Sequence, residues 1–183
     1  MFSMPAVPIM IVLLAAFVAA VTDIWKFKVY NALTLPLLVS GLLYHGFRAE
    51  LTDSLVGILF GFAALITLYL VGGMGAGDVK LMAGVGAWLG MPLTFYVFIA
   101  SSLAAGIYSL LLVVLTGKVG ETVVNLHIVW LRLSSIGRYL AADDRVEKEV
   151  LRSDRRRRII PFAAMVAIGI VATLLWFRKD VLR

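Results

Sequence analysis

The longest uncharged stretch of the chain runs from Leu81 to Gly117 and reads LMAGVGAWLGMPLTFYVFIASSLAAGIYSLLLVVLTG. It holds no charged side chain over 37 residues. A helix needs about 20 apolar residues to cross the hydrocarbon core of a bilayer, so this stretch is long enough for two short crossings. Gly90-Met91-Pro92 offers a turn between them, because glycine and proline interrupt helices. The stretch therefore predicts two membrane-spanning helices.

The rest of the composition agrees with a membrane protein. The 183 residues are 62% hydrophobic and 15% charged, with a mean hydropathy of +0.99. Soluble domains are about half apolar and about a quarter charged, so this composition excludes an ordinary soluble domain. We expect one integral-membrane domain over residues 1–183. Cysteine is absent, which excludes disulfides, thiolate zinc sites and a cysteine nucleophile.

The other uncharged gaps predict four more helices. The fold expected is all-α, a polytopic membrane protein with about six spans: 5–22, 32–47, 54–72, 79–90, 92–116 and 159–177. Residues 79–90 rise only about 18 Å, so this span is either a partial crossing shielded by its neighbours, or the preceding helix ends before residue 72. The first span lacks a basic start and a clear cleavage site, so we expect it to be retained. Gly57 and Gly61 predict close helix packing.

Residues 118–158 form a basic segment that indicates the orientation. It contains ten of the seventeen basic residues, and apolar residues recur at three- and four-residue steps over 119–140. This pattern predicts an interfacial amphipathic helix in a cytoplasmic loop that contacts anionic lipid. With this loop inside, thirteen basic residues are cytoplasmic and both termini are outside, as the positive-inside rule favours. The net charge of +6 is therefore explained by the retention of basic residues on the cytoplasmic side, and no nucleic-acid partner is expected.

Two of the eleven acidic residues do not fall in predicted loops or tails. Asp23 follows the first span, and Asp78 lies between the third and fourth spans. Both fall at the cytoplasmic boundary of the predicted topology, where they could come into contact. Asp23 alone could instead pair with Lys26 or cap the second helix.

Asp78 ends a glycine-rich run, Gly72-Gly73-Met74-Gly75-Ala76-Gly77-Asp78. Glycines let another backbone approach closely, for instance an extended substrate, although a plain inter-helix turn explains them equally well. Lys80 follows two residues later, either as an interfacial anchor or as a charge that biases the ionisation of Asp78.

Three segments together resemble one family. Gly75-Ala76-Gly77-Asp78-Val79-Lys80-Leu81 is similar to the GxGD segment of type IV prepilin peptidases, which are membrane aspartyl proteases. The stretch from Asp23 to Asn31 resembles their first catalytic segment, with Tyr30 in place of a proline and lysines where arginine is common. Ile160-Pro161-Phe162 resembles the start of their final helix. The resemblance covers essentially the whole chain and is closest to short, peptidase-only forms, such as those of Flp-type tight-adherence pili or archaeal preflagellin peptidases. It does not imply methyltransferase activity.

The resemblance implies both a substrate and a site. The substrate is a prepilin whose short basic leader ends in glycine and is removed at the cytoplasmic face of the inner membrane, before the pilus assembly machinery takes the product. The catalytic residues implied are Asp23 and Asp78. The residues implied to support them or to contact the substrate are Asn31, Gly75, Gly77, Lys80 and Pro161. No metal or cofactor is expected, because His45 and His127 form no ligand set with these acids.

A pair of aspartates supports hydrolysis without a covalent intermediate. Two carboxyl groups held close share a proton, so the ionised one can activate water while the other binds the carbonyl oxygen. Two other classes are retained as alternatives. In a small ion-coupled transporter, the acids would form a relay near the middle of the membrane. A non-catalytic scaffold of a pilus or secretion complex would not need either acid.

Overall fold

The structure is a computed structural model that describes residues 6–26, 28–70, 74–117, 130 and 161–177. The regular elements over these residues are all helices, which confirms the predicted all-α class. They are α1 (Ala6–Lys26), α2 (Asn31–Phe47), α3 (Leu51–Leu70), α4 (Ala76–Thr116) and α7 (Phe162–Trp176).

Three of these helices, α1, α3 and α4, are long and apolar enough to cross a membrane, and α7 is a shorter apolar helix. Their outer faces are apolar too. On α1, for example, Met10, Leu14 and Phe17 are each about two-thirds exposed and follow one another at helical spacing. Such faces are typical of helices that contact lipid, so the chain has the properties of a membrane protein.

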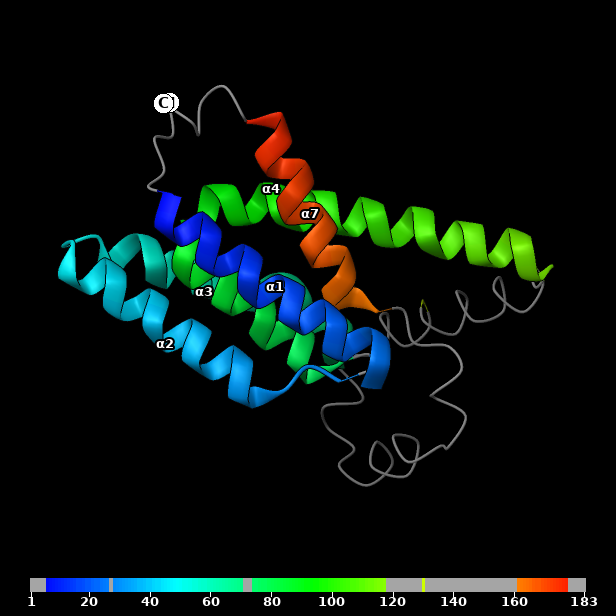
Figure 1. Cartoon of the computed structure of the whole chain (residues 1–183), viewed down its shortest axis with the longest axis horizontal. Helices are drawn as coiled ribbons and strands as arrows, with labels where there is room; N and C mark the ends of the chain where they lie inside the picture. Colours follow the sequence, from blue (N-terminus) through cyan, green and yellow to red (C-terminus); the bar gives the residue numbers. More distant parts are fainter. Residues whose placement is uncertain (1–5, 27, 71–73, 118–129, 131–160, 178–183) are drawn as a thin grey trace.

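Helix α4 is interrupted at Gly90, whose φ of 68° and ψ of 174° are not helical. This positive φ favours glycine, and Pro92 lacks the backbone N–H needed to continue the helix across the break. The predicted turn at Gly90-Met91-Pro92 is confirmed. Figure 1 shows the part of α4 after the break as a long rod that extends beyond the other helices.

The part of α4 before the break lies inside the bundle. Residues 81–90 are all buried, and α4 packs against every other described helix. Burial of every residue over 81–90 means that neighbouring helices cover this segment on all sides. The structure therefore supports the first of the two expectations for this span, a segment shielded by its neighbours.

Glycines bring α3 and α4 into backbone contact. A Cβ atom on Gly57 would collide with the backbone of Gly86, and one on Gly61 would collide with the backbone of Met82. Both glycines are buried. The close packing predicted from Gly57 and Gly61 is confirmed, since no larger side chain fits at this approach.

The bounds of several helices differ from the predicted ones. Helix α3 runs from Leu51 to Leu70 rather than over 54–72, so the helix before span 79–90 also ends earlier than predicted. Helix α1 continues to Lys26 rather than ending at residue 22, and α4 begins at Ala76 rather than at residue 79. Asp23 therefore lies in the last turn of α1, and Asp78 lies in the first turn of α4. The C-terminal end of α1 and the start of α7 lie together at the lower right of Figure 1. Apart from Trp130, the predicted basic loop over 118–158 and its amphipathic helix fall outside the described residues.

Candidate active site

Asp23 is held by the start of a distant helix. Its side chain is buried, with 4% of the residue exposed, and its Oδ2 accepts a hydrogen bond of 3.0 Å from the backbone N–H of Ala163. Ala163 is the second residue of α7, which begins directly after Pro161. Backbone N–H groups in the first turn of a helix lack a partner within the helix, so one of them is free to bind the carboxylate.

Asp78 is positioned by the start of its own helix. Gly75 is the N-terminal cap of α4, and its carbonyl oxygen accepts a hydrogen bond of 3.2 Å from the N–H of Asp78. A Cβ on Gly75 would lie 3.2 Å from Asp78 Oδ2, so a side chain there would crowd the carboxyl group.

The second oxygen of the Asp78 carboxyl group is buried. Its Oδ1 has no hydrogen-bond partner among the described residues. A buried polar atom without a partner is costly, and a water molecule or a substrate group would relieve that cost. The charge of Asp23 also acts electrostatically on the Asp78 carboxyl group. The two acids are thus close enough for the charge of one to act on the other.

The segment between α1 and α2 packs on the turn that carries Asp78. A Cβ on Gly77 would lie 2.8 Å from the carbonyl oxygen of Val29, and Val29 is itself buried. Lys80 Nζ donates a hydrogen bond of 2.9 Å to Oδ1 of Asn31. These two contacts fix the chain just after Asp23 against the chain around Asp78.

Among the described residues, Asp23 makes neither of the two contacts that were the simpler alternatives, a cap on the second helix or an ion pair with Lys26. Helix α2 is capped by Tyr30, without a side-chain hydrogen bond, so the expectation that Asp23 caps this helix is wrong. Within the described part of the chain, no ion pair joins Asp23 to Lys26. Instead, the Nζ atoms of Lys26 and Lys28 lie 5.9 and 5.8 Å from the centre of the Tyr30 ring.

The structure places the supporting residues expected from the sequence as follows: Gly75, Gly77, Lys80 and Asn31 lie in or against the turn that carries Asp78, and Pro161 precedes the helix that binds Asp23. Gly72 and Gly73 lie outside the described residues. Two contributors were not predicted, the backbone of Val29 and the N–H of Ala163. The only sequence signal for the second was Pro161, which marks the start of a helix.

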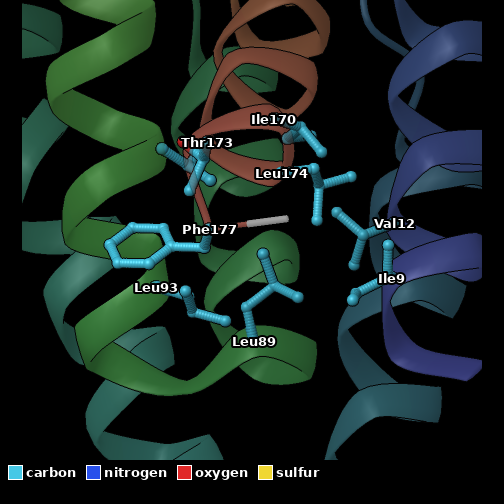
Figure 2. Close-up of a pocket in the computed structure, with 9 residues that line it drawn as sticks. Ile9, Val12, Leu89, Leu93, Ile170, Thr173, Leu174 and Phe177 are labelled. Carbon is cyan, nitrogen blue, oxygen red and sulfur yellow. The ribbon is translucent and has the colours of Figure 1, made fainter. Parts of the chain in front are cut away.

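The apolar pocket in Figure 2 is separate from this site. Its lining includes Val12 of α1, Leu93 of α4 and Ile170 of α7, and none of its lining side chains titrates. Val12 precedes Asp23 by eleven residues, which corresponds to about 16 Å along the helix. The Thr173 hydroxyl group in the lining donates to the carbonyl of Gly169. The pocket thus offers no acid or base.

His45 is also remote from the acids. It lies near the far end of α2, with Nε2 3.2 Å from the carbonyl oxygen of Trp88 and Nδ1 3.6 Å from Glu50 Oε2. Over the described residues, no three His, Asp or Glu side chains gather into a metal site. His127 falls outside that part of the chain.

The sequence places these helices in a known family of membrane peptidases. The chain belongs to the type IV leader peptidase family, whose family model matches residues 10–110. The matched segment contains both Asp23 and Asp78. It ends before α7, so the contact between Ala163 and Asp23 lies partly beyond it.

Several curated proteins are similar over a comparable length. A prepilin leader peptidase/N-methyltransferase of Aeromonas salmonicida is 40% identical over 102 residues, which is 51% of this chain and 35% of that protein. The protein of the same name in Pseudomonas aeruginosa is 35% identical over 91 residues, covering 45% of this chain and 31% of the relative. The one in Neisseria gonorrhoeae is 32% identical over 117 residues, covering 58% and 41%. The matches therefore span less than half of these relatives. No solved structure is significantly similar to the chain.

Proposed function

We propose that the protein is a membrane aspartic endopeptidase that removes the leader from prepilins or prepilin-like proteins. The observation that carries the proposal is the pairing of Asp23, which is buried and hydrogen-bonded, with Asp78, on which its charge acts and whose Oδ1 has no hydrogen-bond partner among the described residues. Membership of the leader peptidase family and the names of the curated relatives support the same activity.

The proposed reaction uses the two carboxyl groups as one acid–base pair. The ionised carboxylate takes a proton from a water molecule, whose oxygen attacks the scissile carbonyl carbon. The protonated carboxyl group hydrogen-bonds to the carbonyl oxygen as negative charge develops on it. When the tetrahedral intermediate collapses, the carbon–nitrogen bond breaks and a proton passes to the leaving amine. Both acids return to their starting states after the products leave.

The proposed substrate is an extended leader peptide that passes the glycine turn. Position 75 is exposed and has no side chain beside the Asp78 carboxyl group, so a substrate backbone can approach there. The proposed substrate has a basic leader that stays in water and an apolar helix that enters the membrane, so the glycine between them lies at the membrane boundary. This places its scissile bond at the level of the helix ends that carry Asp23 and Asp78.

In the proposed topology, six spans cross the inner membrane, and the site faces the cytoplasm together with the basic segment 118–158.

Because the chain has no cysteine, single cysteines can report its orientation. Lys28 and Arg48 are exposed at opposite ends of α2 and make a matched pair. Lys28→Cys should react with an impermeant maleimide only in inverted vesicles, and Arg48→Cys only in intact cells. The reverse labelling would overturn this orientation.

The other two classes have weaker support. A transporter relay would need acids along a path through the bundle, whereas Asp23 and Asp78 lie in the last turn of α1 and the first turn of α4. A scaffold would not need a buried acid whose charge acts on a second, partly buried acid, since taking carboxylates out of water is costly.

The activity can be tested with purified components. The protein, reconstituted in lipid vesicles, is mixed with a prepilin from the same genome, and both products are identified by mass spectrometry. A single cut directly after the leader glycine is expected. Failure to cut any prepilin of the genome under conditions where a curated relative is active would overturn the proposal.

A further inference from the structure

We propose that the first turn of α7 is the positioning element for Asp23, and that it acts through the backbone N–H of Ala163. This inference rests on the proposed function. It adds a group outside the family-matched residues 10–110 to the working site. It also means that the site is built from three helix ends, those of α1, α4 and α7.

The N–H of Ala163 has no partner within its own helix. The carbonyl of Pro161 accepts the N–H of Ala164 at 3.1 Å and that of Met165 at 3.4 Å. The N–H of Ala163 instead points to Asp23 Oδ2 at 3.0 Å. Ala163 is fully buried, so water does not compete for this donor.

The location of Asp23 explains why such a donor is needed. Asp23 sits in the last turn of α1, where the negative end of the helix dipole disfavours a carboxylate. The start of α7 supplies the opposite end of a dipole together with a hydrogen bond, and both favour the carboxylate. The contact also fixes the direction of the side chain, because one of its two oxygens is held. The other oxygen is then oriented relative to Asp78.

Few charged groups compete with this contact. Helix α1 packs against α2, α4 and α7, and α7 carries no titratable side chain. Helix α4 carries Asp78 and Lys80, and Lys80 is bound to Asn31. The remaining titratable or charged groups on these elements are Lys26 on α1, Lys28 and Tyr30 in the connection, Tyr44 and His45 near the far end of α2, and Tyr96 and Tyr108 beyond the break in α4. Of these charged groups, Asp78 is the one on which the charge of Asp23 acts.

Two proline variants distinguish loss of the hydrogen bond between Ala163 and Asp23 from a general disturbance of the first turn of α7. Ala163→Pro removes the donor to Asp23, while Ala164→Pro removes a neighbouring N–H in the same turn and leaves that donor in place. Proline is tolerated in the first turn of a helix, so both variants should insert and fold. Replacing Ala163 with lactic acid is a second test of the same contact, because it puts an ester oxygen in place of the N–H and adds no ring.

The full-length protein is assayed in vesicles with a prepilin. Loss of a hydrogen bond to a charged group should lower kcat by about tenfold or more, with little change in KM, in both Ala163 variants. The limb of the kcat/KM pH profile that reports ionisation of Asp23 should also move to higher pH by about one unit. The reason is that the ionised form of Asp23 loses a stabilising donor. Ala164→Pro should keep the wild-type profile.

The outcomes separate this inference from the proposed function. If the wild type and Ala164→Pro cleave the prepilin and the folded Ala163 variants match them in kcat and pH profile, the positioning role is wrong and the function stands. If the wild type cleaves no prepilin, the proposed function itself fails. An equal loss of kcat in Ala163→Pro and Ala164→Pro, with an unchanged profile in the ester variant, would also overturn the positioning role.

Discussion

The ammonium group of Lys80 donates a hydrogen bond of 2.9 Å to the side-chain oxygen of Asn31, the first residue of α2. The contact joins the turn that carries Asp78 to the connection that follows Asp23. A cation at the N-terminal end of a helix is unfavourable with respect to the helix dipole, so the carbonyl oxygen of Asn31 is what makes this position acceptable for Lys80. The bond therefore links the two halves of the candidate site.

Loss of this bond should slow cleavage. Asn31→Ala and Lys80→Met should each lower kcat by about tenfold, because a hydrogen bond to a charged group contributes about 1.5 kcal/mol and the two acids lose alignment without it. Asn31→Asp keeps an oxygen acceptor and should retain more activity than Asn31→Ala. Steady-state cleavage of a prepilin measures the three rates.

A double variant checks that the two residues act together. If they act through one bond, Asn31→Ala combined with Lys80→Met should be no slower than the worse single variant. If the fold-decrease in kcat of the double variant equals the product of the two single decreases, each residue acts separately.

A methyl group at position 77 should disturb the site. It would meet the carbonyl oxygen of Val29 at 2.8 Å, so either the connection after Asp23 or the turn before Asp78 must move. A displacement of about 1 Å between reacting groups can cost about 100-fold in rate, and we expect a loss of that order for Gly77→Ala. Gly106→Ala is the matched control, since a Cβ there has no atom within 4 Å. Equal cleavage rates for the two variants would contradict the role of this contact.

The contact between α3 and α4 should govern stability rather than chemistry. Gly57→Ala places a methyl group against the backbone of Gly86, and neither helix can retreat without opening the core. Overpacking of this kind costs about 1–3 kcal/mol, which lowers the melting temperature of a chain of this size by several degrees. Thermal unfolding in detergent tests this effect, again with Gly106→Ala as the control. An unchanged melting temperature for Gly57→Ala would show that the helices are not packed so closely.

The helices could be located from the sequence because charge is costly in a bilayer, and the uncharged gaps therefore follow the helices closely. The break at Gly90 was also predictable, since glycine and proline both disfavour a continuous helix. The end of α1 was predicted four residues too early. A charged residue was taken to mark the boundary, yet Asp23 is buried inside the last turn and Lys26 extends outward from it.

The two acids were found by elimination, as the carboxyl groups outside the predicted loops and tails. Their partners were harder to predict. Ala163 and Val29 contribute backbone atoms, which carry no signal in the identity of the residue. The hydrogen bond from Ala163 also joins residues 140 positions apart, a pairing that no local pattern specifies. Pro161 indicated only that a helix begins there.

The most direct test of the account is the processing of a co-expressed prepilin by Asp23→Asn and Asp78→Asn. Asp53→Asn is the matched control, because Asp53 is an exposed acid in the first turn of α3. The fraction of prepilin that loses its leader is measured on a gel, in membranes that contain equal amounts of each variant. The account predicts full processing with the wild type and Asp53→Asn, and no detectable processing with Asp23→Asn or Asp78→Asn. Continued processing with both of these variants would contradict the assignment of the two aspartates as the catalytic pair.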